Sequence, residues 1–185
     1  LFSLMILITI TWNETMAIVV TVKLVDENGL ALSNYPPSTS EMSYKYRCGG
    51  SWSYVSNVQT NALGQFTTVD ITCTGWDGKI TLALHQKSDE QVVTGSTVTF
   101  QTARVNVNLK NPCTGLVTDS PGGTVKQGGG HWYTHGTTSG TGVVTFYTFP
   151  GNVKLEMGYH YKSITQNPVA IAAGVNEVDF LTTTV

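Results

Sequence analysis

The sequence predicts an all-β protein of two tandem β-sandwich domains, preceded by one additional β-strand. Three observations lead to this prediction. Short alternating apolar runs are separated by turns rich in Gly, Asn and Asp, with almost no helical periodicity. A set of sequence anchors occurs twice in the same order. The first twelve residues carry no charge and form an alternating apolar segment of their own.

The segment Leu1–Trp12 has the period-2 pattern of a strand. Polar Ser3, Thr9 and Thr11 fall on one face, and the other face is apolar at every position. The apolar face consists of Phe2, Leu4, Ile6, Ile8, Ile10 and Trp12. Eleven of the first 24 residues are Ile, Val or Thr, and β-branched residues at that density disfavour a helix. A secretory leader cleaved near residues 15–17 is the alternative interpretation.

The rest of the chain divides into short strands at regular turn signals. Such a series is typical of immunoglobulin-like (Ig-like) β-sandwiches. In the first unit we expect strands near 18–25, 42–48, 52–60, 65–72, 79–86, 91–93 and 97–103. In the second unit we expect strands near 103–110, 123–128, 131–138, 143–149, 152–160, 161–165 and 168–181.

Seven anchors repeat at offsets of 73 to 85 residues, always in the same order. Val20–Leu24 recurs as Val105–Leu109, and Gly49–Trp52 matches Gly129–Trp132. Chance matching does not preserve such an order, so the sequence indicates two homologous domains. The predicted division is a donor strand and crossing segment at 1–17, one Ig-like sandwich at 18–103 and a second at 104–185.

The junction between the two units contains no flexible linker. Phe100–Val105 passes from the last strand of one unit into the first strand of the next without Gly, Pro or Ser. A flexible connection needs such residues, so we expect a stiff joint and two domains stacked end to end.

Composition argues against several function classes. Ten basic and twelve acidic residues give a net charge of −2 with no Lys/Arg cluster, which does not favour nucleic acid as a partner. The Cys and His spacings match no metal-binding motif, so we expect neither a metal nor another cofactor. His131 and His135 share a strand face but lie roughly 13 Å apart, too far for a catalytic relay. We therefore expect that the protein is not an enzyme.

Three cysteines permit one disulfide. Strand polarity places Cys48 and Cys73 at the same end of the first sandwich, so we expect these two to pair, with two buried free thiols as the alternative. Cys113 lies in the first turn of the second unit, and we expect it to be unpaired or intermolecular. Asn13 lies in an Asn-Glu-Thr sequon and is a candidate glycosylation site, which together with the Thr, Ser and Gly content favours an extracellular location.

A resemblance to a known family lies in the first strand, its Asn-Gly turn, the pattern from Lys45 to Trp52 and the late Val-x-Phe-x-Thr strand. In these features the two units resemble carboxypeptidase-regulatory-like, or prealbumin-like, repeats of microbial surface proteins. This resemblance covers about residues 18–185. It implies structural spacers, stalks and adhesin modules, and not catalysts.

Aromatic residues suggest a second function class. Trp52, Trp132 and Tyr133 lie on strands where a flat face can stack on sugars, which would make the protein a surface adhesin or carbohydrate-binding module with glycans as partners. The repetition of Trp52 and Trp132 at equivalent positions favours core aromatics instead.

The surplus strand favours a filament. Each domain already has about seven strands, so residues 1–12 have no position in their own chain and can complete a sheet of a neighbouring, identical subunit. Because residues Phe180–Val185 match Phe100–Val105, we expect this strand to contact the neighbour's C-terminal domain. The contact is head-to-tail and gives a filament, as in donor-strand-exchanging pilins, without a membrane span in the assembled form.

Overall fold

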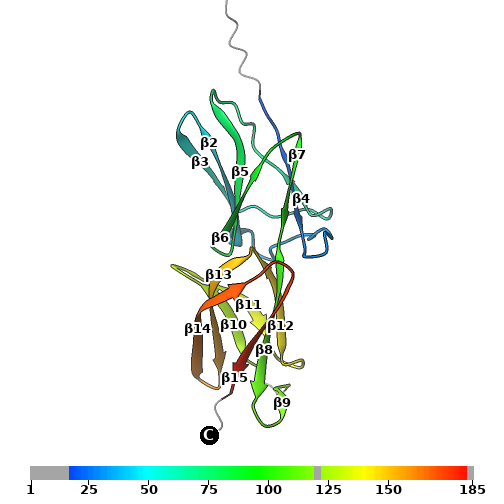
Figure 1. The fold of residues 1–185 in the computed structure, drawn as a ribbon, viewed down its shortest axis with the longest axis vertical. Coiled ribbons are helices and arrows are strands. Elements are labelled where there is room, and N and C mark those ends of the chain that lie inside the picture. The colour runs from blue at the N-terminus through cyan, green and yellow to red at the C-terminus, as the bar shows by residue number, and fades with distance from the viewer. Residues whose placement is uncertain (1–16, 119–121, 183–185) are drawn as a thin grey trace, which may run out of the picture.

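The computed structural model describes residues 17–118 and 122–182, which form four β-sheets arranged as two sandwiches (Figure 1). Helical structure among the described residues amounts to one 3-10 turn, η1 (Thr39–Glu41). The predicted all-β fold class is therefore confirmed. The predicted donor strand, residues 1–12, and Asn13 lie outside the described residues.

We call the two bodies the N-terminal and the C-terminal sandwich. The strands of the N-terminal sandwich are β1 (Thr21–Val25), β2 (Met42–Cys48), β3 (Ser51–Ser56), β4 (Gln65–Thr67), β5 (Trp76–Leu84), β6 (Lys87–Val92) and β7 (Thr97–Gln101). Those of the C-terminal sandwich are β8 (Ala103–Asn111), β9 (Gly115–Leu116), β10 (Thr124–Gly128), β11 (Trp132–Thr137), β12 (Val143–Thr148), β13 (Gly151–Tyr159), β14 (Lys162–Ile171) and β15 (Val175–Leu181).

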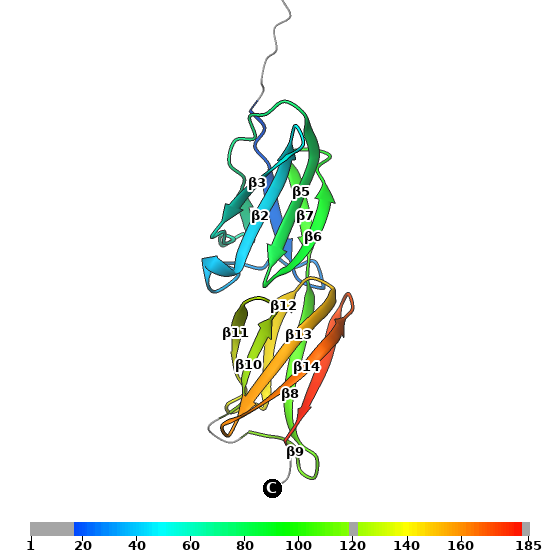
Figure 2. The same cartoon turned by 90° about the vertical axis from the view of Figure 1, so that its left-hand side faces the viewer.

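The two sandwiches have the same strand order. In the N-terminal sandwich, sheet β4-β1-β7 packs on sheet β3-β2-β5-β6. In the C-terminal sandwich, β12-β8-β15 packs on β11-β10-β13-β14, and β9 forms a short hairpin with β8. The first and last strands of each sandwich pair in parallel, β1 with β7 and β8 with β15. Figure 2 shows the sandwiches stacked along one axis.

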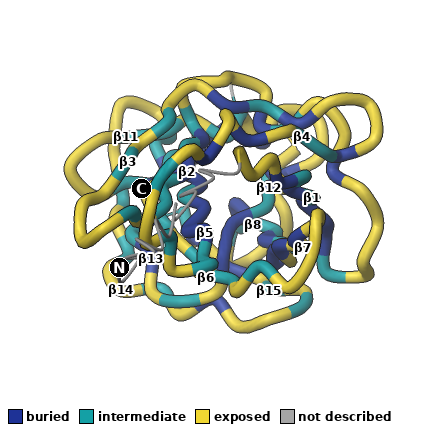
Figure 3. The backbone as a smooth tube through the Cα atoms, turned by 90° about the horizontal axis from the view of Figure 1, so that it is seen from above, coloured by how far each residue is buried: buried dark blue, intermediate teal, exposed yellow. Residues whose placement is uncertain are grey.

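Each sandwich has its own core, because alternate strand residues point between the sheets. In β1 and just before it, Val20, Val22 and Leu24 are fully buried, whereas Lys23 points outward and is half-buried. The view along the long axis shows buried residues gathered between the sheets and exposed loops around them (Figure 3). Among the described residues, the two core clusters consist of apolar side chains, as expected for sheets with one buried and one solvated face.

The last two strands differ from the sequence-based expectation of 161–165 and 168–181. β14 runs without a break from Lys162 to Ile171, and the turn follows at residues 172–174. Pro168 does not end the strand because it lies on an edge strand, at the register shift between the Val153–Val169 and Leu155–Gln166 pairs, where a missing N–H breaks no ladder. Asn176 holds the turn, since its side chain accepts from the Ala172 N–H and donates to the Ala172 carbonyl.

Among the described residues, no helix is long and apolar enough to traverse a bilayer.

Candidate assembly surfaces

The sandwiches meet at a contact that we call the joint. One residue, Thr102, separates β7 from β8, and it is buried. Its N–H and its hydroxyl both donate to the Val25 carbonyl, at 2.9 and 3.0 Å. These two hydrogen bonds hold the connecting residue against the end of β1. Whether the two sandwiches fold independently, with a boundary at residues 103–104, remains a prediction. The structure does show that the two strands are joined without a flexible linker.

Phe149 of the C-terminal sandwich is buried in the core of the N-terminal sandwich. Its ring centroid lies 6.1 Å from that of Phe100, and it is 1 % exposed. The inward residues of β12 are Val144, Phe146 and Thr148, so Phe149 points away from its own core. The N-terminal sandwich therefore provides the apolar surroundings in which the Phe149 side chain is buried.

Tyr35 clamps the backbone of Tyr147 across the joint. Its hydroxyl donates to the Tyr147 carbonyl at 2.9 Å and accepts from the Tyr147 N–H at 3.1 Å. The two rings also meet edge to face, with centroids 5.8 Å apart. Burial raises the pKa of the Tyr35 hydroxyl well above its ordinary value, so it remains a donor at physiological pH.

The turn between β5 and β6 supplies most of the polar contacts of the joint. Gln127 donates to the His85 carbonyl at 3.0 Å, and Gln86 donates to the His131 carbonyl at 3.2 Å. The Lys87 ammonium donates to the Asn152 carbonyl at 2.9 Å. These bonds fix the turn against the C-terminal sandwich at several points.

Two histidine rings meet inside the joint. The centroids of His85 and His135 are 4.5 Å apart, and His135 stacks on Phe146 at 3.7 Å. Burial, and secondly the neighbouring His85, lowers the pKa of His135 to about 2. On its other side, His85 lies 3.4 Å from the Glu41 carboxylate. The joint therefore contains a histidine that is held neutral.

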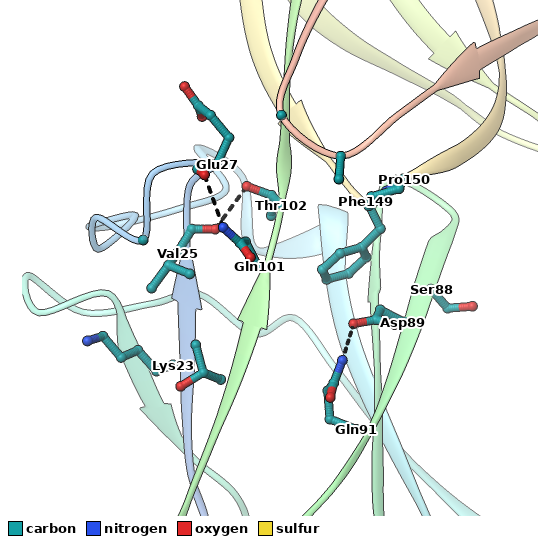
Figure 4. Close-up of a pocket in the computed structure, with 14 residues that line it drawn as sticks. Lys23, Val25, Glu27, Ser88, Asp89, Gln91, Gln101, Thr102, Phe149 and Pro150 are labelled. Carbon is teal, nitrogen blue, oxygen red and sulfur yellow. Dashed lines mark hydrogen bonds between the residues drawn. The ribbon is translucent and has the colours of Figure 1, made fainter.

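A groove of about 860 Å³ opens beside the joint (Figure 4). Phe149 enters it from the C-terminal sandwich, while Asp89 and Gln101 line it from the N-terminal sandwich. Gln101 donates to the Glu27 carbonyl at 3.0 Å, which ties the β7 end to the first turn. The lining is mixed polar and apolar.

The far end of the C-terminal sandwich, which we call the distal pole, carries an open apolar hollow of about 560 Å³. Leu109, Met157, Tyr159 and Ile164 contribute its apolar lining. Beside it, the β13–β14 turn exposes Tyr161 completely. The corresponding end of the N-terminal sandwich is covered by the joint.

The opposite end of the molecule, which we call the N-terminal pole, carries the β2–β3 turn and the start of β1. A disulfide joins Cys48 and Cys73 there, with Cα atoms 5.8 Å apart. Ile18, Val19 and Val69 are each more than a third exposed at this pole. Cys113 is a free, exposed cysteine at the other end of the molecule.

The three aromatic residues singled out in the sequence do not form one face. Trp52 is 41 % exposed beneath the Lys45 ammonium, 4.2 Å from the ring centroid. Trp132 lies similarly beneath Lys154 at 4.8 Å, and Tyr133 packs on His85 in the joint. The interpretation of Trp52 as a core aromatic was wrong, because its strand position faces solvent.

Sequence analysis missed Phe149 and Tyr35, the two residues that interlock the sandwiches. Phe149 did leave a signal, because it is a large apolar residue that breaks the alternation of its strand. Tyr35 left none, since a Tyr in a loop with Pro and Ser has no distinctive pattern.

No protein-family model matches this sequence, and no curated protein matches it. Among solved structures, the chain is similar to the Bacillus anthracis TIE protein, with 12% identity, a TM-score of 0.33 and coverage of 90% of this chain and 33% of that one. A streptococcal ancillary pilin is 11% identical at a TM-score of 0.34, over 92% of this chain and 63% of that one. A group B streptococcus pilus 2b backbone protein is 8% identical at 0.34, over 88% and 83%.

The chain therefore spans about a third of the length of the TIE protein structure and less than two thirds of the length of the ancillary pilin structure. Scores this low do not establish a shared fold, and no inference about function is drawn from these likenesses.

Proposed function

We propose that the protein is a structural subunit of an extracellular filament, in which residues 1–12 of one subunit insert as a β-strand into the neighbouring subunit. The observation that carries this proposal is the linker-free, interlocked joint between two sandwiches stacked end to end. A body whose two sandwiches are joined through buried and hydrogen-bonded contacts is suited to a fibre.

The positions of the two ends support head-to-tail assembly. The described chain starts at the N-terminal pole, and β15 ends at the distal pole, at the opposite end of the long axis (Figure 1). A segment that leaves one pole and binds near the other adds subunits along the long axis. Because donor and acceptor surfaces differ, such a contact propagates into a filament unless its rotation closes a ring.

Acceptor edges are available in the C-terminal sandwich. β14 and β15 are the last strands of their sheets, so among the described residues one side of each has no strand partner. Addition of residues 1–12 to such an edge would satisfy its backbone groups. Burial of the six apolar side chains of the segment contributes about 10 kcal/mol before the cost of ordering.

The disulfide between Cys48 and Cys73 supports an extracellular location, because disulfides persist in oxidising compartments.

Deletion of residues 1–12 tests this function. We expect soluble, folded subunits that no longer polymerise, measured by electron microscopy and by sedimentation. The variant Ile6→Asp/Ile8→Asp places charge on the apolar face and is expected to abolish filaments. The matched variant Thr9→Asp/Thr11→Asp places the same charge on the other face and should assemble far better. Unchanged polymers after the deletion would rule the proposal out.

A second candidate function is a surface adhesin or carbohydrate-binding module. The exposed Trp52 and Tyr54, with Lys45 between them, form an aromatic and cationic surface on the outer face of the N-terminal sandwich. Sugars stack on such rings. Glycan binding that is lost in a folded Trp52→Ala variant, while deletion of residues 1–12 leaves it intact, would favour this function.

A further inference from the structure

We infer that the distal pole is the docking surface for the N-terminal pole of a second copy of this chain, packed in the way that the two sandwiches are packed at the joint. This inference rests on the proposed function and adds to it a second, sandwich-to-sandwich contact that does not involve residues 1–12 directly. We call the end of each sandwich that is nearer the bottom of Figure 1 its lower end. The lower end of the N-terminal sandwich is covered by the C-terminal sandwich at the joint, whereas the lower end of the C-terminal sandwich is the open distal pole.

The backbone frames of the two lower ends correspond residue by residue. Leu24 pairs in register with Phe100, and Leu109 pairs in register with Phe180. Thr102 donates its N–H to the Val25 carbonyl at 2.9 Å. Thr182 donates its N–H to the Lys110 carbonyl at 2.8 Å, the same bond one sandwich further along.

The hairpin turns at the two lower ends also correspond. His85 and Gln86 have φ angles of 49° and 65°, and His160 and Tyr161 have φ angles of 45° and 63°. The first turn is bonded to the C-terminal sandwich through Gln86 and through Lys87. The second turn has the same shape and the same following Lys, yet it is exposed, and Tyr161 is 110% exposed.

Three residues that line the hollow at the distal pole correspond to three that line the joint groove. Ser88, Asp89 and Thr102 line the groove, and Ser163, Ile164 and Thr182 line the hollow. The acidic Asp89 thus corresponds to the apolar Ile164. The distal hollow is therefore the more apolar of the two, which favours a buried contact over a solvated surface.

Two positions of the N-terminal pole correspond to joint positions of the C-terminal sandwich. Val69, two residues beyond the β1–β4 register, corresponds to Tyr147, the residue clamped at the joint. Ser51 corresponds to His131, which contacts Gln86. Val69 is 47% exposed, and Ile18 beside it is 36% exposed. A second copy stacked on the distal pole would bury these apolar side chains.

Charge fits the same orientation. The distal pole presents the exposed Lys162, and the N-terminal pole presents exposed Asp70 and Asp77 together with one exposed Arg47. Lys110 and Asp179 at the distal pole neutralise each other at 2.6 Å. The acidic groups that can pair with Lys162 therefore lie on the N-terminal pole, which makes that pole the complementary partner.

Cysteine crosslinking tests the inference. In a Cys113→Ser background, Tyr161→Cys combined with Ser51→Cys should give, on oxidation of assembled full-length chain, a ladder of reducible multimers. Each single substitution should give no ladder. Gln86→Cys with His131→Cys is the matched control within one chain, where those residues already touch, and should give an intrachain disulfide.

The outcomes separate the two proposals. Filaments without the ladder would overturn this inference and leave the proposed function standing, whereas absence of filaments together with absence of the ladder would overturn both. A dimer from Tyr161→Cys alone, in place of the ladder, would indicate pole-to-pole packing and also overturn the inference.

An independent variant charges the hollow. Tyr161→Asp/Ile164→Asp should raise the critical concentration for assembly at least tenfold. Leu63→Asp places a charge on an exposed apolar residue in the turn before β4, away from both poles, and should leave it unchanged. Equal effects of the two variants would contradict the docking surface.

Discussion

The N-terminal and C-terminal sandwiches share a strand order, but they are held together by different means. The N-terminal sandwich is linked at one end by the Cys48–Cys73 disulfide and filled at the other end by Phe149. The C-terminal sandwich has neither, and its first and last strands are joined instead by polar side chains. The same strand order is therefore stabilised by a disulfide and a buried aromatic ring in one sandwich, and by polar side chains in the other.

The polar reinforcement connects β8 to β15. Asn106 donates to Glu177 at 2.6 Å, and Asn108 donates to Glu177 and to Asp179, both at 2.9 Å. The hydrogen bonds from Asn106 and Asn108 lower the pKa of Glu177, and those from Lys110 and Asn108 lower the pKa of Asp179. Both carboxyl groups are therefore ionised at neutral pH.

The largest expected effect comes from the joint. Phe149→Ala removes a fully buried aromatic side chain and should lower the free energy of unfolding by about 3–4 kcal/mol. Ile164→Ala at the open hollow removes a half-buried side chain and should cost less than about 1 kcal/mol. Urea unfolding of both variants measures the difference. Equal losses of stability would contradict the difference between a side chain buried at the joint and one at the open distal pole.

The disulfide should have the next largest effect. It closes a separation of 25 residues, so Cys48→Ala/Cys73→Ala is expected to lower the free energy of unfolding by about 3 kcal/mol. Cys113→Ser changes an exposed free cysteine and should stay within about 0.5 kcal/mol. Denaturant unfolding under non-reducing conditions provides the comparison, and a loss of comparable size in both variants would contradict it.

The smallest effect concerns pH. Because the pKa of His135 is lowered to about 2 in the fold, the unfolded chain binds a proton below about pH 6.5 that the folded chain does not. The free energy of unfolding should therefore be unaffected by this group above pH 6.5 and should fall by about 2 kcal/mol by pH 5.

The variant His135→Phe isolates this contribution. It keeps a ring beside Phe146 and His85 and should flatten the pH dependence of the melting temperature between pH 6.5 and 5. His160→Phe changes an exposed histidine of the C-terminal sandwich and serves as the control. If the His160 variant flattens the curve as much, the pH dependence does not originate in the joint, where His85 and Glu41 are the other titratable neighbours.

The positions of most strands could be predicted from the sequence, but features that depend on how the strands pair could not. β2 was predicted as 42–48 and observed as Met42–Cys48, because its apolar alternation and the following Gly-Gly turn are local signals. The stretch was predicted as two strands, 161–165 and 168–181, whereas β14 runs over Lys162–Ile171, because its length depends on its pairing with β13, which a local pattern does not encode.

By itself the sequence determined the all-β class and the inward residues of most strands. These follow from period-2 alternation and turn chemistry, which act over a few neighbouring residues. The tertiary structure decided how the two sandwiches interlock. The burial of Phe149, the Tyr35 clamp and the neutral His135 all depend on contacts with the other sandwich, 49 to 112 residues away along the chain. Contacts of that range leave no periodic signal, because neither partner's local pattern encodes the other.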